Sequence, residues 1–159
     1  MDEELRIFQE SVIRFLEDRA PSARVQKWRE NGQVEREFWR EAAEAGLLGV
    51  SIPEQYGGAG GNFGHDYVLI DLVTRKDISG FSVSLHNGIV MPYVNLHGSD
   101  EQKVRWLPRL TNGELVGAIA MSEPNAGSDL ASLQTRAEDR GDHYLINGQK
   151  VWKIGRAHV

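Results

Sequence analysis

The residues of this sequence best suited to chemistry lie in the stretch AIAMSEPNAGSDLAS, residues 118–132. An apolar, strand-like run ends there in the hydroxyl groups of Ser122 and Ser128 and the carboxylates of Glu123 and Asp129. Hydroxyls beside exposed backbone N–H groups form a donor set that suits a planar, acceptor-rich ring or a phosphate. Gly127 would let such a ligand approach the main chain, and Asp129 would hold the loop by accepting its N–H groups. An Asx-type turn with a capped bend explains the same residues, so both interpretations stand at this point.

Helices must position this loop, because helical periodicity runs through the chain up to about Leu115. The apolar spacing predicts an amphipathic helix that ends before Pro21, and a second helix over 34–45 followed by Gly46 at its C-cap. Residues 57–64 contain five glycines but lack the Lys-Ser/Thr pair of a phosphate-binding P-loop. We therefore expect this glycine cluster to form a helix-to-helix turn.

Two further helices are predicted over 66–76 and 81–97. The second is almost wholly apolar, so we expect it to be buried on most sides and kinked at Gly88 and Pro92. His86 and His97 could share a face of this helix. Because they lack the spacing of metal ligands, we expect no metal site there.

The last helix opens with a capping-box pattern at Ser99 and Gln102 and is expected to stop near Pro108. After that helix the periodicity becomes that of extended chain, with turn signals that include Asn147-Gly148, a strong hairpin cue. The predicted strands are LVGAIAM (115–121), LQTRAED (133–139) and HYLINGQKVW (143–152).

Composition narrows the class of protein. At 159 residues the chain is about one domain long, and its net charge of −5 is spread without a basic block, which excludes a nucleic-acid groove. The absence of cysteine excludes disulfides and thiolate chemistry. No apolar run suggests a signal peptide or a membrane span, so we expect a soluble, cytoplasmic protein.

Four stretches occur in the same order in one known family: LLGVSIPEQYGGAGG (47–61), SLHNGIVMPYVNLHGSDEQKVRWLPRLTNGELVGAIAM (84–121), AMSEPNAGSDLAS (120–132) and YLINGQKVW (144–152). Through them the chain resembles the acyl-CoA dehydrogenase family over about residues 3–153. The amino-acid sequence around His86 and His97 is most similar to that of the long-chain branch of this family.

The resemblance implies an α+β fold: an all-α N-terminal domain over residues 1–115, then the first strands of an antiparallel middle β-domain over 116–153. A C-terminal helical bundle would follow. It also implies an FAD-dependent dehydrogenase of fatty acid beta-oxidation that converts an acyl-CoA thioester to the trans-2-enoyl-CoA. Its partners would be the acyl-CoA substrate and an electron-transfer flavoprotein, and the full-length form would be a homotetramer. An acyl-CoA oxidase, another thioester dehydrogenase and a non-catalytic helical interaction module remain as alternatives.

The implied cofactor-binding residues occupy the opening stretch and one later position. Ser122 would donate to the flavin pyrimidine edge, Ser128 would also touch the acyl-CoA substrate, and Glu123 is expected to be structural. No residue here is assigned as catalytic, because the general-base Glu is expected beyond the chain end. The FAD-binding set is Ile119, Ala120, Met121, Ser122, Glu123, Pro124, Asn125, Ala126, Gly127, Ser128 and Trp152.

The sequence departs from the family pattern at two places. Asn125 stands where many relatives have Gly, and Asn tolerates the same left-handed backbone region. After NGQKVW the family continues with small and hydroxyl residues, whereas Lys153 and Ile154 follow here. The ending IGRAHV resembles nothing in the family and can be encoded by ATCGGAAGAGCACACGTC, which reads like a sequencing adapter. We therefore expect residues 154–159 to be a non-native tail without a functional role.

Overall fold

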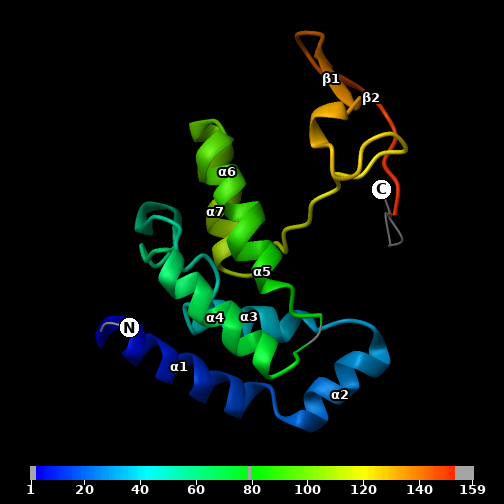
Figure 1. Ribbon diagram of the computed structural model, residues 1–159. Coiled ribbons are helices and arrows are strands. Elements are labelled where there is room, and N and C mark those ends of the chain that lie inside the picture. The colour runs from blue at the N-terminus through cyan, green and yellow to red at the C-terminus, as the bar shows by residue number, and fades with distance from the viewer. Residues whose placement is uncertain (1–2, 79, 153–159) are drawn as a thin grey trace. The chain divides into compact units, whose positions relative to one another are not determined.

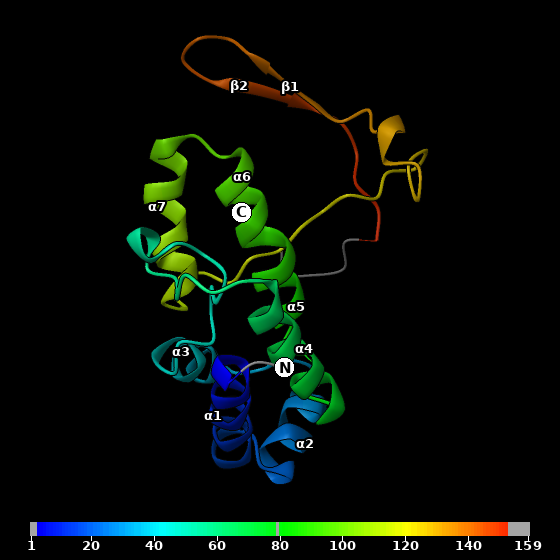
Figure 2. The same ribbon diagram turned by 60° about the vertical axis from the view of Figure 1, so that its left-hand side comes forward.

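The computed structural model describes residues 3–78 and 80–152, so the predicted tail at 154–159 lies outside the described residues. Two compact units divide the chain, Met1–Ala118 and Ile119–Val159. The first unit is helical and the second contains a short antiparallel hairpin, as the ribbon views show (Figures 1 and 2). The predicted fold class, helices followed by antiparallel strands, is confirmed.

The first two helices are α1 (Glu3–Arg19) and α2 (Ser22–Asn31). Pro21 separates them as predicted and then serves as the N-cap of α2, with φ of −62°. α2 was not among the predicted helices, because the face that it buries consists only of Val25 and Trp28. Gly32, in the left-handed region at φ 68°, ends this helix.

α3 (Arg36–Glu44) buries Phe38, Trp39 and Ala42 on one face. Gly46 follows its end with φ of 71°, which confirms the predicted glycine stop. The Gly46 N–H donates to Ala43 O at 2.9 Å and thereby satisfies one carbonyl of the last helical turn.

The glycine cluster connects the short 3-10 helix η1 (Glu54–Tyr56) to α4 (Phe63–Arg75), so the predicted helix-to-helix turn is confirmed. Gly57 has φ of 82°, a region that favours glycine. α4 starts earlier than predicted because Asn62 caps it, accepting from Gly64 N at 2.8 Å.

The predicted 81–97 helix consists of α5 (Val83–Leu85), the π-helical turn η2 (His86–Val90) and α6 (Met91–His97). The irregularity expected at Gly88 and Pro92 is thus present as a π-turn, which precedes a proline that has no N–H to donate. Burial on most sides was wrong: Tyr93 is 61% exposed and Leu96 72% exposed. His86 is buried whereas His97 is exposed, so the two histidines have different surroundings.

α7 (Asp100–Thr111) begins at the predicted capping box, in which Gln102 N donates to Ser99 Oγ at 3.3 Å. The predicted stop at Pro108 was wrong, because the helix continues to Thr111. Proline removes one N–H, and in the last turn this single lost bond does not end the helix. The Thr111 hydroxyl donates to Pro108 O at 3.0 Å.

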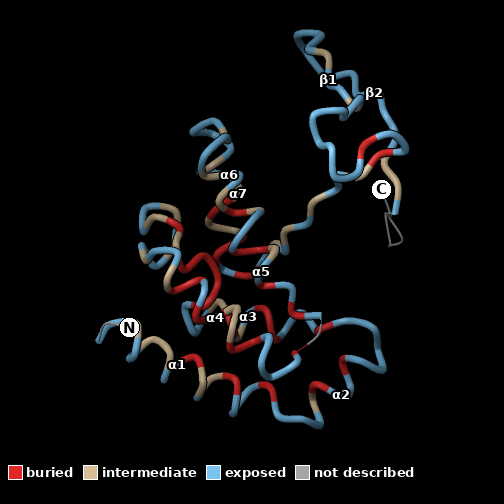
Figure 3. The backbone as a smooth tube through the Cα atoms, viewed as in Figure 1, coloured by how far each residue is buried: buried red, intermediate tan, exposed pale blue. Residues whose placement is uncertain are grey.

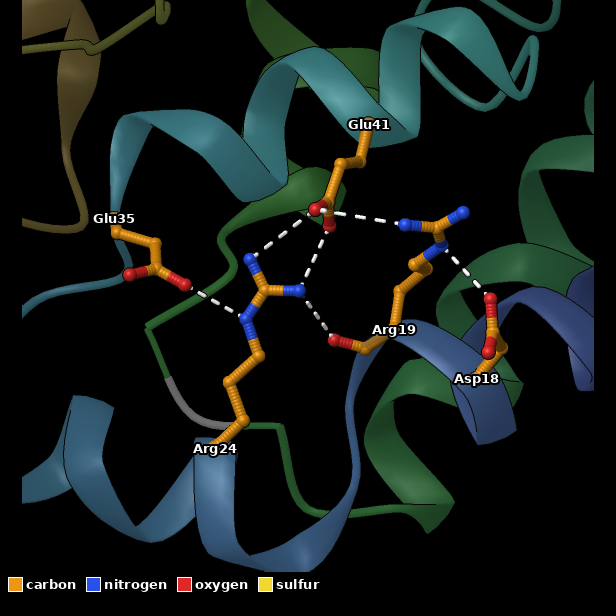
Figure 4. Close-up of polar contacts among 5 residues, drawn as sticks. All are labelled: Asp18, Arg19, Arg24, Glu35 and Glu41. Atoms are coloured by element: carbon orange, nitrogen blue, oxygen red, sulfur yellow. Dashed lines mark hydrogen bonds and ion pairs between the residues drawn. The ribbon is translucent and has the colours of Figure 1, made fainter.

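The core of the first unit is apolar and gathers residues from all parts of that unit (Figure 3). Phe38 is fully buried at its centre, with ring centroids 4.7 Å from Trp28 and 4.8 Å from Phe81. Beside it Arg24 of α2 donates to Glu35 Oε1 at 2.6 Å and to Glu41 Oε2 at 2.8 Å (Figure 4). One guanidinium group therefore ties α2 to α3.

In the second unit, β1 (Arg136–Asp139) pairs antiparallel with β2 (Tyr144–Asn147). The turn between them spans 140–143, so the predicted hairpin turn at Asn147-Gly148 was wrong. Gly148 is required for another reason: a Cβ there would lie 2.1 Å from Thr135 Oγ1. Its glycine permits close packing of two segments.

The predicted strand over 115–121 was also wrong for the residues described. Residues 115–121 form no hydrogen-bonded ladder with any described strand. A segment becomes a β-strand only where a neighbouring strand completes its backbone hydrogen bonds. The predicted strands over 133–139 and 143–152 shorten to β1 and β2.

Within the described ranges, no helix combines the length and apolar character needed to cross a membrane. The same ranges contain no grouping of three or more His, Cys, Asp or Glu side chains that could hold a metal ion.

Candidate functional site

The loop singled out by the sequence is a tight turn in the second unit. Glu123 N donates to Ala126 O at 2.9 Å and Ala126 N donates back to Glu123 O at 3.2 Å, which places Pro124 and Asn125 at the corner. Ala126 is buried, with 1% of its surface exposed. The turn thus closes through main-chain bonds and not through the side-chain bond that defines an Asx-type turn.

The Glu123 side chain holds this turn to the start of the hairpin. Its carboxylate is buried and accepts from Gln134 N at 2.7 Å, from Thr135 N at 3.1 Å and from Lys150 Nζ at 2.8 Å. The hydrogen-bonded Lys150 ammonium, together with the bonds from Thr135 and Gln134, lowers the pKa of Glu123 to about 2. The structural role predicted for Glu123 is consistent with these bonds.

Lys150 was not a predicted site residue, yet it joins two segments of the loop region. Its ammonium group donates to Met121 O at 3.0 Å as well as to Glu123. The next residue continues the connection, because Val151 N donates to Ser122 O at 3.0 Å. Lys150 lies in the NGQKVW stretch, but no spacing rule connects a lysine to a glutamate 27 residues away.

The Ser122 and Ser128 hydroxyls make no hydrogen bond to any described residue, so both remain available to a ligand. Ser122 is half-buried and Ser128 is exposed. Between them lies Gly127, where an added Cβ would meet no atom within 4 Å and where φ is outside the left-handed region. Neither backbone conformation nor packing within the described chain explains glycine there, whereas close approach of a ligand would.

Two expectations about neighbouring residues were wrong. Asp129 accepts from the Ser132 hydroxyl, not from backbone N–H groups of the loop. Asn125 does not adopt positive φ, since Asp77 and Trp152 are the non-glycine residues with positive φ among those described. The tolerance of Asn for left-handed backbone is therefore not what permits it at this corner.

The remaining predicted site residues lie on either side of the turn. Ile119 is half-buried, Ala120 is exposed and Met121 is 39% exposed. Trp152 is 84% exposed and has φ of 60°, an uncommon conformation for a non-glycine residue. These residues present apolar surface and main-chain groups near the two serine hydroxyls.

This donor set fits a flavin. An isoalloxazine ring offers a row of carbonyl and nitrogen acceptors along its pyrimidine edge, and hydroxyl and amide donors are their complements. Ser122 and Ser128 supply hydroxyls that no described residue uses, and Gly127 leaves the main chain accessible between them. The residues present are thus compatible with FAD.

The first unit holds a second group of buried polar side chains. His86 is fully buried; its Nδ1 accepts from Gly117 N at 2.9 Å and its Nε2 donates to Leu110 O at 3.1 Å. Burial lowers the pKa of His86. The π-turn therefore carries a neutral imidazole that fastens the segment leading out of the helical unit.

Asn87, the next residue of the π-turn, is also buried. Its side chain accepts from Gly49 N at 3.2 Å and donates to Leu47 O at 2.9 Å and to Asp66 Oδ1 at 3.4 Å. Burial raises the pKa of Asp66, and the bonds from Ser51 and Asn87 oppose that rise. These contacts hold the connection after α3 against the π-turn, and we assign them no chemistry.

Comparison with known families gives matches over both units. The family model "Acyl-CoA dehydrogenase, N-terminal domain" matches residues 2–114, and the family model "Acyl-CoA dehydrogenase, middle domain" matches residues 118–159. The loop with Ser122 and Ser128 falls in the second match.

Two similar curated proteins are named for different acyl-CoA substrates. Long-chain specific acyl-CoA dehydrogenase of Sus scrofa is 40% identical over 92% of this chain and 34% of its own length. Isovaleryl-CoA dehydrogenase of Bos taurus is 37% identical over 96% of this chain and 36% of its own length. The chain thus spans about a third of the length of these relatives.

Solved structures agree with the sequence comparisons. An acyl-CoA dehydrogenase from Geobacillus kaustophilus has a TM-score of 0.84 and 39% identity, covering 94% of this chain and 39% of that one. A glutaryl-CoA dehydrogenase from Mycobacterium smegmatis, solved in complex with FADH2, has a TM-score of 0.84 and 31% identity, covering 96% of this chain and 39% of that one. The family match over residues 2–114 includes most of the chain, which therefore belongs to the acyl-CoA dehydrogenase family.

Proposed function

We propose that this chain supplies part of the flavin site of an FAD-dependent acyl-CoA dehydrogenase, which converts an acyl-CoA thioester to the trans-2-enoyl-CoA. The observation that supports it most directly is that the Ser122 and Ser128 hydroxyls, on either side of the open Gly127, have no hydrogen-bond partner among the described residues. These residues fall within the match to the family's middle domain.

The residues proposed to hold FAD are those of the turn and its approaches, Ile119 to Ser128, and Trp152. When bound, FAD supplies the acceptor for the hydride that leaves the substrate. Ser122 would donate its hydroxyl proton to the pyrimidine edge, and Ser128 would also contact the acyl-CoA. Donors aimed at an edge where negative charge develops stabilise that charge, and they do so best when they are already in place before the reaction.

Glu123 is unsuited to remove the substrate proton. Its oxygens already accept from two backbone amides and from Lys150, and its pKa of about 2 makes it a weak base near neutral pH. We therefore assign Glu123 a structural role and not that of the general base.

We further propose that the two domains span residues 1–115 and 116–153. The proposed substrate is a medium- to long-chain acyl-CoA of fatty acid beta-oxidation, and the proposed electron acceptor is an electron-transfer flavoprotein. The proposed full-length form is a homotetramer. The long-chain relative supports this substrate, whereas the isovaleryl-CoA relative favours a short branched thioester. A cytoplasmic location stays a prediction from composition.

A chimera tests the proposed function. Residues 3–152 replace the corresponding part of the Geobacillus kaustophilus acyl-CoA dehydrogenase, which supplies the rest of the fold. We expect a yellow protein that bleaches when acyl-CoA is added anaerobically. A panel of isovaleryl-, octanoyl- and palmitoyl-CoA on the full-length enzyme ranks the substrates, and oxygen consumption by that enzyme separates an oxidase from a dehydrogenase.

The variant Ser122→Ala should weaken FAD binding by the chimera about tenfold, the value of one hydrogen bond to a group that gains charge. Ser11→Ala, on the exposed face of α1, is the matched control and should leave the FAD dissociation constant unchanged. A folded chimera without flavin colour, or a Ser122→Ala variant with unchanged affinity, would contradict the proposal.

A further inference from the structure

Few hydrogen bonds from the described residues hold the segment that carries Ser122. Residues 119–122 form no strand ladder with any described residue. Within the described part of the chain, two hydrogen bonds fasten this segment to another: Val151 N to Ser122 O at 3.0 Å, and Lys150 Nζ to Met121 O at 3.0 Å. Both come from adjacent residues of one later segment.

Lys150 also neutralises the carboxylate that follows Ser122. Its ammonium group lies 2.8 Å from Glu123 Oε1, and the Glu123 side chain is only 4% exposed. A buried carboxylate is costly unless it is paired and hydrogen-bonded, and Glu123 meets that requirement through Lys150 and the amides of Gln134 and Thr135. The lysine thus has two acceptors, one on each side of Ser122.

We propose that Lys150 is a positioning residue for the flavin site, because it holds Ser122 in register with the segment that leads to Trp152. The inference rests on the proposed function for its consequence, which is flavin binding. Lys150 itself is assigned no contact with substrate or cofactor; it acts through Met121 O and the Glu123 carboxylate.

A purely local role for Lys150 has a different signature. If the lysine only stabilised the hairpin, its loss would affect the β1–β2 ladder, in which Glu138 pairs with Leu145 and Ala137 with Ile146. If it positions the Ser122 turn, its loss would instead release the amides bound by Glu123 and the Val151 amide. These two sets of amides can be followed separately.

Amide hydrogen exchange of the 159-residue chain, measured by NMR, tests the inference. In Lys150→Met, which keeps the aliphatic stem but loses the charge, the amides of Gln134, Thr135 and Val151 should exchange at least about tenfold faster, as expected for loss of a hydrogen bond to a charged group. The β1–β2 amides should change less than about twofold. Lys27→Met, an exposed lysine of α2, is the matched control and should change neither set.

Two rescue variants guard against simple misfolding. Lys150→Arg keeps a positive donor and should recover most of the protection. The double variant Glu123→Gln with Lys150→Met should recover protection at Gln134, since the neutral amide oxygen can accept from the Gln134 N–H without a buried charge. Equal acceleration in the ladder and in the turn, or no acceleration in Lys150→Met, would overturn the inference.

Flavin affinity connects the inference to function, and it is measured in the chimera because residues 3–152 supply only part of the proposed flavin site. In the chimera with Lys150→Met the FAD dissociation constant should rise about tenfold, with recovery in Lys150→Arg. A folded chimera without flavin would count against the proposed flavin site, while the exchange data would still decide whether Lys150 positions the turn. Equal FAD affinity in the unsubstituted and Lys150→Met chimeras would overturn the positioning role.

Discussion

Replacing His86 by leucine should destabilise the helical unit by about 2 kcal/mol. Leucine matches the ring in volume, so the loss comes from hydrogen bonds rather than from a cavity. Leu110 O keeps a second donor, Gly113 N at 3.3 Å, whereas Gly117 N loses its acceptor. An unpaired backbone N–H away from water costs about 1–3 kcal/mol, and this range sets the expected value.

His86→Leu should also remove a pH dependence of the free energy of unfolding. The folded-state pKa of His86 lies below the ordinary histidine value of 6.5, so the unfolded chain takes up a proton first as the pH falls. The stabilisation that neutral His86 provides is therefore complete above about pH 6.5 and is lost as the pH falls towards its folded-state pKa. The free energy of unfolding falls there by up to about 1.4 kcal/mol per pH unit. Asp66, whose pKa is raised, acts in the opposite direction at lower pH.

Urea unfolding between pH 5 and 8, followed by tryptophan fluorescence, measures both effects. Trp39 is a suitable reporter because its ring centroid lies 5.3 Å from that of His86. The difference between the unsubstituted chain and His86→Leu cancels the contribution of Asp66. His86→Gln, which can both accept and donate, serves as the control and should lose less than half as much stability. A His86→Leu variant within about 0.5 kcal/mol of the unsubstituted chain at pH 7.5, or an unchanged pH profile, would refute the reasoning.

Three further substitutions test the packing described above. Phe38→Ala should cost about 3–5 kcal/mol in urea unfolding, because a fully buried ring is removed, and a loss below about 1 kcal/mol would contradict its central place. Arg24→Ala should lower the free energy of unfolding by about 2 kcal/mol. Arg24→Lys should recover little of this loss, because lysine lacks the planar guanidinium that bonds both carboxylates, and full recovery would argue against that geometry. Gly148→Ala should destabilise the hairpin by about 1–3 kcal/mol, because the added Cβ would clash with Thr135, and the β1–β2 amides should then exchange faster. Gly127→Ala should leave the exchange of these amides unchanged. A larger effect of Gly127→Ala than of Gly148→Ala would contradict the packing argument.

Short-range rules succeeded where the relevant partners are near in sequence. The capping box at Ser99 and Gln102, the glycine stop at Gly46 and the break at Pro21 depend on atoms within one helical turn, so residue types alone predict them. The Pro108 stop failed because the effect of a proline depends on how many helical bonds remain after it. The apolar 81–97 segment was expected to be buried on most sides, but composition does not say which faces a fold covers.

The Asn147-Gly148 hairpin cue shows how one residue type can meet two different demands. Glycine suits a tight turn, but Gly148 serves to let Thr135 pack against the main chain. The distinction depends on a neighbour 13 residues earlier in the sequence. A local pattern carries no information about that contact.

By itself, the sequence determined most of the helices, the helix stop at Gly46, the capping box at Ser99, the family resemblance and the loop in which Ser122 and Ser128 stand. The tertiary structure decided which of the polar groups are already used. Glu123 and Asp129 look alike in sequence, yet Glu123 is buried against Lys150 and two amides, whereas Asp129 is exposed and bound to a nearby hydroxyl. The reason is physical: the charge state and availability of a side chain depend on the groups that surround it in space, and for Glu123 the decisive one lies 27 residues away.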